Sequence, residues 1–228
     1  MSHAHWNNCI THFDDEVGAF VRDYFADEGR HCLLVAAAGF DPRSQVIARM
    51  LAETLGDRLG ALFIREERGK PDANLVSDAD ANEAALAAIV PNCRVERIDI
   101  FGDDGAAIGG SNVAAMLSRA EIDPAITDVM LDISALSIGI GFPVAKLLLG
   151  DCEATGYRAF HILIVSNPEL DDRISSEPAL AVQYIETARY EFDGSDRRDD
   201  DPPEMIVHVL LSGPAYGDYG AIASADPE

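Results

Sequence analysis

The chain has 228 residues, and its 17 basic and 40 acidic side chains give a formal net charge of 17 − 40 = −23. A surface this acidic cannot neutralise a phosphate backbone, so we expect no direct binding to duplex nucleic acid. No apolar stretch reaches the roughly 20 residues of a membrane span, so we expect no membrane association. Four widely spaced cysteines without a CxxC pair predict a reducing, cytoplasmic location.

The first 30 residues are predicted to form an N-terminal helical extension, with a helix over residues 13–25. A domain over residues 31–212 follows, in which apolar runs alternate with helical patterns. The predicted strands cover residues 32–38, 61–64, 95–101, 129–134 and 161–165. The predicted helices cover residues 42–55, 83–90, 111–120 and 142–149, and residues 68–82 are predicted to be a long polar loop.

This alternation predicts an α/β fold, a Rossmann-like three-layer α/β/α sandwich with a mostly parallel sheet of five to six strands. Beyond residue 167 the pattern weakens. We expect a helix within residues 179–190, an acidic linker over residues 193–204 and a strand over residues 205–211. Residues 213–228 have no periodicity, which is typical of a disordered tail or of a chain that is part of something longer.

Two loops are the candidate site. If the five strands have the common order 3-2-1-4-5, the first and fourth are neighbours, and the loops that follow them share one crevice at the carboxyl edge of the sheet. Those loops are Gly39–Ser44 and Asp132–Ser137.

The first loop offers groups that suit an anion or a nucleotide. Gly39 permits close backbone approach, Asp41 is predicted to cap a helix with Pro42 at its first position, and Arg43 is a forked donor. Phe40 and Ser44 complete the candidate ligand contacts. The alternative is a plain strand-to-helix turn in which Arg43 makes a structural ion pair. The loop lacks GxGxxG and P-loop spacing.

The second loop begins with a carboxylate inside an apolar strand. Asp132 and Ser134 share one face of that strand, and a buried carboxylate needs a partner. The pair either contacts a ligand hydroxyl, a base edge or a catalytic proton, or Asp132 binds loop N–H groups or Arg43. Ser137, within a predicted flexible stretch up to residue 141, and Ser166 and Asn167, after the fifth strand, are the remaining candidates.

Metal chemistry has weak support. His3, His5, Cys9 and His12 are suitable ligands, but a terminal segment rarely supplies a preorganised site, so we expect no metal and no cofactor. His161 is predicted to be a hydrogen-bonded core residue.

The run Ala38–Ser44, together with Leu131–Ser134 and Ser166–Leu170, resembles a group of poorly characterised Rossmann-like bacterial proteins with a GF[DE]xRS loop and a DIS motif, associated with defence gene neighbourhoods. The Asp-x-Ser motif is also similar to that of CARF domains, which sense cyclic oligoadenylates. This resemblance implies ligand contacts at Gly39, Arg43, Asp132, Ser134 and Ser137, and a homodimer. CARF domains usually carry a basic residue shortly after the motif, where this chain has Ile138 and Gly139.

Three functions stay open. The first is a nucleotide-binding or nucleotide-sensing, CARF-like domain of a prokaryotic defence-type system, without catalysis, whose partners are a nucleotide or small anionic ligand and a second copy or an effector protein. The second is an enzyme that hydrolyses a nucleotide or an N-glycosidic bond with Asp132 as its candidate catalytic residue. The third is an interaction or scaffold module.

Overall fold

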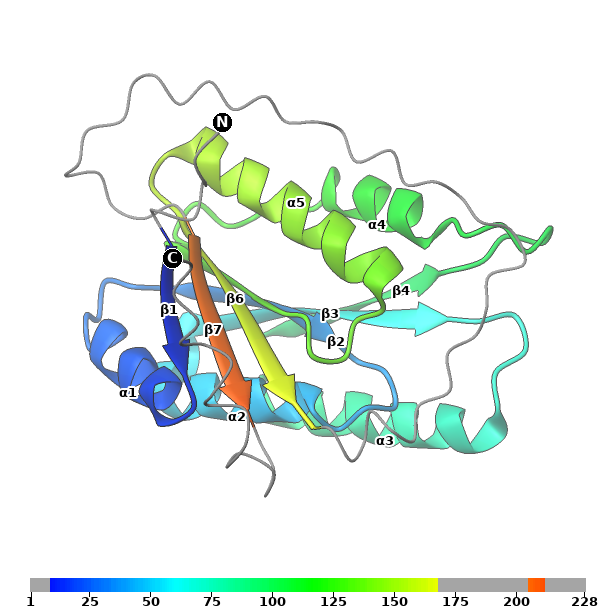
Figure 1. Cartoon of the computed structure of the whole chain (residues 1–228), viewed down its shortest axis with the longest axis horizontal. Coiled ribbons are helices and arrows are strands. Elements are labelled where there is room, and N and C mark those ends of the chain that lie inside the picture. Colours follow the sequence, from blue (N-terminus) through cyan, green and yellow to red (C-terminus); the bar gives the residue numbers. More distant parts are fainter. Residues whose placement is uncertain (1–8, 168–204, 212–228) are drawn as a thin grey trace, which may run out of the picture.

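The computed structural model describes residues 9–167 and 205–211 (Figure 1). In these residues seven strands form one sheet in the order β1-β7-β6-β5-β2-β3-β4, and all neighbouring strands are parallel. The strands are β1 (Cys9–Phe13), β2 (Cys32–Ala37), β3 (Leu59–Glu67), β4 (Cys93–Asp99), β5 (Asp128–Asp132), β6 (Ala159–Ser166) and β7 (Met205–Leu211). The predicted order of the five central strands is therefore confirmed.

Helices cover both faces of the sheet, as right-handed crossovers between parallel strands require. Helices α1 (Asp15–Tyr24), α2 (Ser44–Leu55) and α3 (Ala73–Ile89) lie on one face, and α4 (Gly109–Leu117) and α5 (Ile138–Thr155) lie on the other (Figure 1). A 3-10 turn, Gly56–Arg58, joins α2 to β3. The α/β class and the three-layer Rossmann-like architecture are thus confirmed.

Two hydrophobic clusters fill the spaces between the layers. One packs α1 and α2 against the sheet, with Val21, Leu51 and Phe63 at its centre. The other packs α4 and α5 against the opposite face, around Leu131 and Val144. The central strands β2 and β5 are buried along almost their whole length, which explains why their sequences are continuously apolar rather than alternating.

The N-terminal segment contributes to both the sheet and the core. Its residues 9–13 form β1, which the sequence analysis did not predict, and this strand pairs with β7 at the sheet edge. Helix α1 then buries Val17, Val21 and Phe25. The strand over residues 205–211 was predicted correctly.

Two predicted loops are wrong. Most of the polar segment 68–82 belongs to α3, which begins at Ala73 with the Asp72 carboxylate accepting a hydrogen bond from Asn74 N. The stretch over residues 137–141 is not a flexible loop, because α5 begins at Ile138 and includes both of its glycines.

The remaining boundaries shift by a few residues. Helix α2 begins at Ser44 rather than at Pro42, and Arg43, not Asp41, holds the N-cap position. The helix and linker predicted within residues 179–204, and the predicted tail, lie outside the described residues. No helix in the described part of the chain has the length and apolar character to cross a membrane.

Candidate functional site at the carboxyl edge of the sheet

The loops that follow β2 and β5 meet, as the strand order requires. The two strands are hydrogen-bonded neighbours, with Val35 opposite Leu131. Helix α2 leaves β2 toward one face and α5 leaves β5 toward the other, so a crevice opens between them. A pocket of about 430 Å³ lies at this edge, between the loops after β2, β3 and β5 and the first turns of α3.

The predicted residues divide into two groups around this pocket. Its walls include Gly39, Phe40, Asp41, Arg43, Ser134 and Ser137. Ser44 and Asp132 are buried beside it without lining it. Ser166 and Asn167 are partly buried at the end of β6 and are not among the lining residues.

Arg43 forms an ion pair with Asp41 of its own loop. Its Nη2 lies 2.6 Å from Oδ2 of Asp41, and its Nε lies 2.9 Å from the same oxygen. The Arg43 backbone N–H also donates to Asp41 Oδ1 at 2.9 Å. One carboxylate therefore neutralises the guanidinium and binds an N–H group at the start of α2, where a ligand anion would otherwise bind.

Asn82 holds this loop in shape, and sequence analysis missed it. Its side-chain amide donates to Gly39 O at 2.7 Å and to Ser44 Oγ at 3.0 Å, and its oxygen accepts from Gln45 at 2.6 Å. The side chain is 4% exposed and comes from α3, 37 residues beyond Gln45. This role comes from contacts between segments about 40 residues apart, so no signal in the sequence around Asn82 reveals it.

Asp132 is the most unusual group at the site. It is 1% exposed, and its Oδ1 accepts hydrogen bonds from the backbone N–H and the hydroxyl of Ser134. Its Oδ2 is buried and has no hydrogen-bond partner in the structure. Burial raises the pKa of Asp132 to about 6, although the Ser134 hydrogen bonds favour the charged form. Of the two structural alternatives predicted for Asp132, the bond from a loop N–H group is formed, by Ser134, whereas the pair with Arg43 is not.

Ser134 links this carboxylate to the next strand. Its hydroxyl donates to Asp132 and accepts a hydrogen bond from Val165 N on β6 at 2.7 Å. Hydrogen bonds to Asp132 on β5 and to Val165 on β6 therefore hold the loop after β5 in place. Ser134 is partly buried and lines the pocket, so it lies between the pocket and the buried carboxylate.

Glu66, at the end of β3, also escaped the sequence analysis. Its Oε1 accepts from the backbone N–H of Ser137 at 2.7 Å, and the Ser137 hydroxyl also hydrogen-bonds to this carboxylate. Ser137 is the N-cap residue of α5, whose first turn contains no acidic side chain. Glu66 thus supplies, from 71 residues away, the negative charge that the N-terminus of α5 favours. Burial raises the pKa of Glu66.

Arg65, a basic residue of the pocket wall, is similarly paired. Arg65, 5% exposed, lies 2.7 Å from Asp80 and 2.9 Å from Glu83 of α3. These ion pairs tie the middle of α3 to the end of β3. Lys70 lies further out, on the exposed β3–α3 loop.

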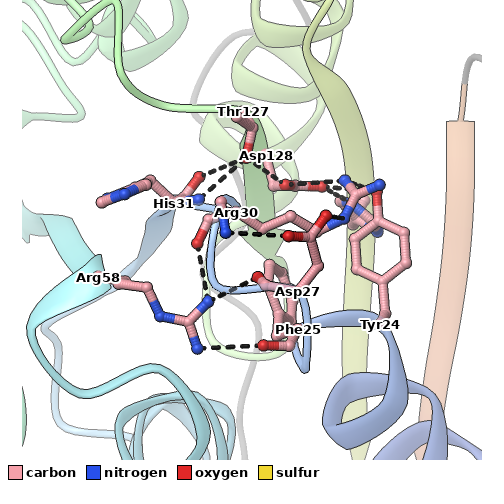
Figure 2. A network of polar contacts seen from close by, with 10 residues as sticks. Tyr24, Phe25, Asp27, Arg30, His31, Arg58, Thr127 and Asp128 are labelled. Atoms are coloured by element: carbon pink, nitrogen blue, oxygen red, sulfur yellow. Dashed lines mark hydrogen bonds and ion pairs between the residues drawn. The ribbon is translucent and has the colours of Figure 1, made fainter.

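A polar network occupies the opposite, amino edge of the sheet (Figure 2). Asp128, the first residue of β5, is fully buried and accepts from Tyr24 at 2.8 Å and from Thr127 at 2.7 Å. His161 Nε2 lies 2.9 Å from the same carboxylate, and Arg30 completes the set at 3.3 Å. His161 is fully buried, so the prediction of a hydrogen-bonded core histidine is confirmed.

No protein-family model matches the chain, and neither does any curated protein sequence. Within residues 9–167 and 205–211, no group of three or more His, Cys, Asp or Glu side chains is arranged to hold a metal ion. The candidate site therefore rests on the pocket, the hydrogen bonds around it and the buried carboxylate of Asp132.

Proposed function

We propose that this chain is a nucleotide-binding domain whose ligand lies over the carboxyl ends of β2 and β5. The observation that carries this proposal is the buried Oδ2 of Asp132, which has no partner and lies beside an open pocket of about 430 Å³. A buried oxygen without a hydrogen bond destabilises the fold, typically by about 1–3 kcal/mol. A ligand hydroxyl or amino group that donates to it would remove that cost.

The chemistry of the walls supports a nucleotide-class ligand. Phe40, Val76 and Leu136 provide apolar surface for a planar base, and Ser134 and Ser137 provide hydroxyl groups. The volume also falls within the range of about 300–1,000 Å³ that is typical of small-molecule sites.

Thermal denaturation with a ligand panel tests the proposal. The panel holds the common nucleosides, their mono- and triphosphates, NAD and a cyclic oligoadenylate. We expect at least one member to raise the midpoint in a concentration-dependent manner. If no member of the panel shifts the midpoint or shows heat of binding in calorimetry, the proposal is wrong.

Hydrolysis of a nucleotide or an N-glycosidic bond is the second candidate, because the pKa of Asp132 near 6 suits a general base. In this reaction Asp132 accepts a proton from water, the water oxygen bonds to the ribose C1′, and the base leaves with the electron pair of the broken C–N bond. Chromatography of the panel after incubation tests it, and Asp132→Asn should abolish any product. Binding without products favours the first candidate.

The sensor role, the defence setting and the homodimer implied by the CARF resemblance belong to the same proposal. Two observations favour it over a pure scaffold, in which an Arg43–Asp132 pair would fill the crevice. Arg43 binds Asp41 instead, and the crevice is open. Analytical ultracentrifugation with and without the bound panel member tests the homodimer.

A further inference from the structure

The helices that begin beside the pocket are all capped by carboxylates of the chain itself. Asp41 binds the N–H of Arg43 at the start of α2, and Asp72 binds the N–H of Asn74 at the start of α3. Glu66 binds Ser137 at the start of α5. Helix N-termini are where parallel α/β folds usually hold a ligand phosphate, because their free N–H groups and dipoles favour negative charge. Here each of these positions already carries a negative charge.

Two of the four cations that line the pocket are compensated in the same way, and the other two, Arg68 and Lys70, belong to the loop after β3. Arg43 lies in a forked ion pair with Asp41, and Arg65 is held between Asp80 and Glu83. A phosphate placed at these helix starts would therefore meet their carboxylates, together with Arg43 and Arg65, which already have acidic partners. It would lose its hydration without gaining equivalent donors.

The carboxylates at the pocket can still form hydrogen bonds, as acceptors rather than donors. Asp132 Oδ2 is an acceptor, and the carboxylates of Asp41 and Glu66 have further lone pairs toward which a ligand can donate. Such acceptors are satisfied by ribose hydroxyls and by the exocyclic amino groups of bases, not by phosphate oxygens.

We infer that the pocket selects the uncharged nucleoside part of its ligand and that phosphate groups weaken binding, with Glu66 excluding them from the N-terminus of α5. This inference rests on the proposed nucleotide-class ligand and specifies which part of it is recognised. It also replaces the small anionic ligand expected from the sequence with an uncharged one.

The test compares each nucleoside with its 5′-monophosphate and 5′-triphosphate by calorimetry, in magnesium-free buffer at fixed ionic strength. We expect the affinity to fall by about tenfold or more with the first phosphate, since like charges in a partly buried site repel strongly. Equal or tighter binding of the monophosphate would overturn the inference and leave the proposed function intact. Absence of binding by every nucleoside and nucleotide would overturn both.

The net charge of −23 repels every anion, so a second comparison separates local from general repulsion. Glu66→Gln keeps an oxygen that accepts from Ser137 and removes the charge. We expect it to raise the affinity for the monophosphate, relative to the nucleoside, by about fivefold or more. The control Glu96→Gln makes the same charge change on the edge strand β4, where that side chain is 40% exposed, and should alter the ratio by less than about twofold.

If both variants change the ratio equally, the repulsion is general and the role of Glu66 is refuted. Circular dichroism and denaturation of each variant establish that the fold is intact. The series with the unmodified protein tests the preference for the nucleoside whether or not Glu66→Gln folds.

Discussion

Strand β5 carries a buried aspartate at each end, and the two have opposite surroundings. Asp128, at the amino edge, has hydrogen-bond partners on both oxygens, from Tyr24, Thr127, Arg30 and His161 (Figure 2). Asp132, at the carboxyl edge, has one satisfied oxygen and one without a partner. Both lie on the same face of the strand and both are almost completely buried.

The pKa values follow from this difference. Burial favours the neutral form of both groups, but the hydrogen bond and charge of His161, with further bonds from Thr127 and Tyr24, hold the pKa of Asp128 below its ordinary value. Burial of Asp132 is not offset to the same extent, and its pKa rises to about 6. Asp128 is thus a structural residue, whereas Asp132 costs the fold stability at neutral pH, which is typical of residues at functional sites.

The largest effect is expected at Asp128. Asp128→Asn removes a buried charge and leaves Tyr24, Arg30 and His161 with a poorer acceptor, so unfolding should become easier by about 3–5 kcal/mol. Urea denaturation at pH 7 measures the change. A loss below about 1 kcal/mol would mean that the network contributes little, and the contrast between the two aspartates would fail.

Asp132→Asn is the matched substitution at the other end of β5, and it should have the opposite sign. The folded pKa of Asp132, about 6, lies above the ordinary value of 3.8. Because the folded pKa is raised, Asp132 contributes fully to the free energy of unfolding below pH 3.8, and this contribution is lost as the pH rises through 6. The unmodified protein therefore loses about 3 kcal/mol from this group on going from pH 3.8 to pH 8, at about 1.4 kcal/mol per pKa unit.

We expect Asp132→Asn to be more stable than the unmodified protein at pH 8 and to lose this advantage near pH 4. Denaturation curves at four pH values between these limits measure it. The charges that face Asp132 are Asp41, which raises its pKa, and Arg43, which lowers it. A variant that is equally destabilised at every pH would show that Asp132 is a structural residue like Asp128.

The sequence predicted the elements whose own residues show that they are buried, and it missed elements without such a local signal. Continuous apolar runs such as residues 32–38 indicated the central strands, because burial on both faces leaves a direct compositional signal. Their order was expected only because it is common in sheets of this kind. The strand β1 left no such signal, since it is a five-residue mixture of apolar and polar side chains that pairs with β7 almost 200 residues later. The start of α3 was hidden because its first ten residues, 73–82, are rich in Asp, Asn and Ser, which are also typical of turns and loops.

The site was predicted in part for the same reason. Asp132 and the Gly39–Ser44 loop stand out because polar residues abruptly follow apolar strands. Glu66 and Asn82 have no local signal of their role, which comes from contacts with Ser137 and with the loop after β2, 71 and about 40 residues away. Such roles depend on tertiary structure and cannot be derived from spacing.

A smaller effect is expected at Asn82, the buried clamp on the first loop. Asn82→Ala leaves the carbonyl of Gly39 and the amide of Gln45 without their partner and should cost about 2 kcal/mol. It should also weaken ligand binding, because the loop would no longer be held in shape. The control is Asn112→Ala, which removes one exposed bond to Asp99 O and should cost about 0.5 kcal/mol. Equal losses in the two variants would show that Asn82 has no special role.

The smallest effect on stability is expected at Phe40, whose side chain is partly exposed in the pocket wall. Phe40→Ala should change the free energy of unfolding by about 1 kcal/mol or less, since little packing is lost. The affinity for the best nucleoside should nevertheless fall by about tenfold, because stacking a base on an aromatic ring contributes about 1–3 kcal/mol. Calorimetry measures the nucleoside affinity of Phe40→Ala and of the control Phe142→Ala, which removes an aromatic ring that is 66% exposed on α5. The difference between the two variants isolates the effect of the pocket. If the two variants bind equally well, the base does not stack on Phe40, and the ligand is held by the Asp132 side of the crevice alone.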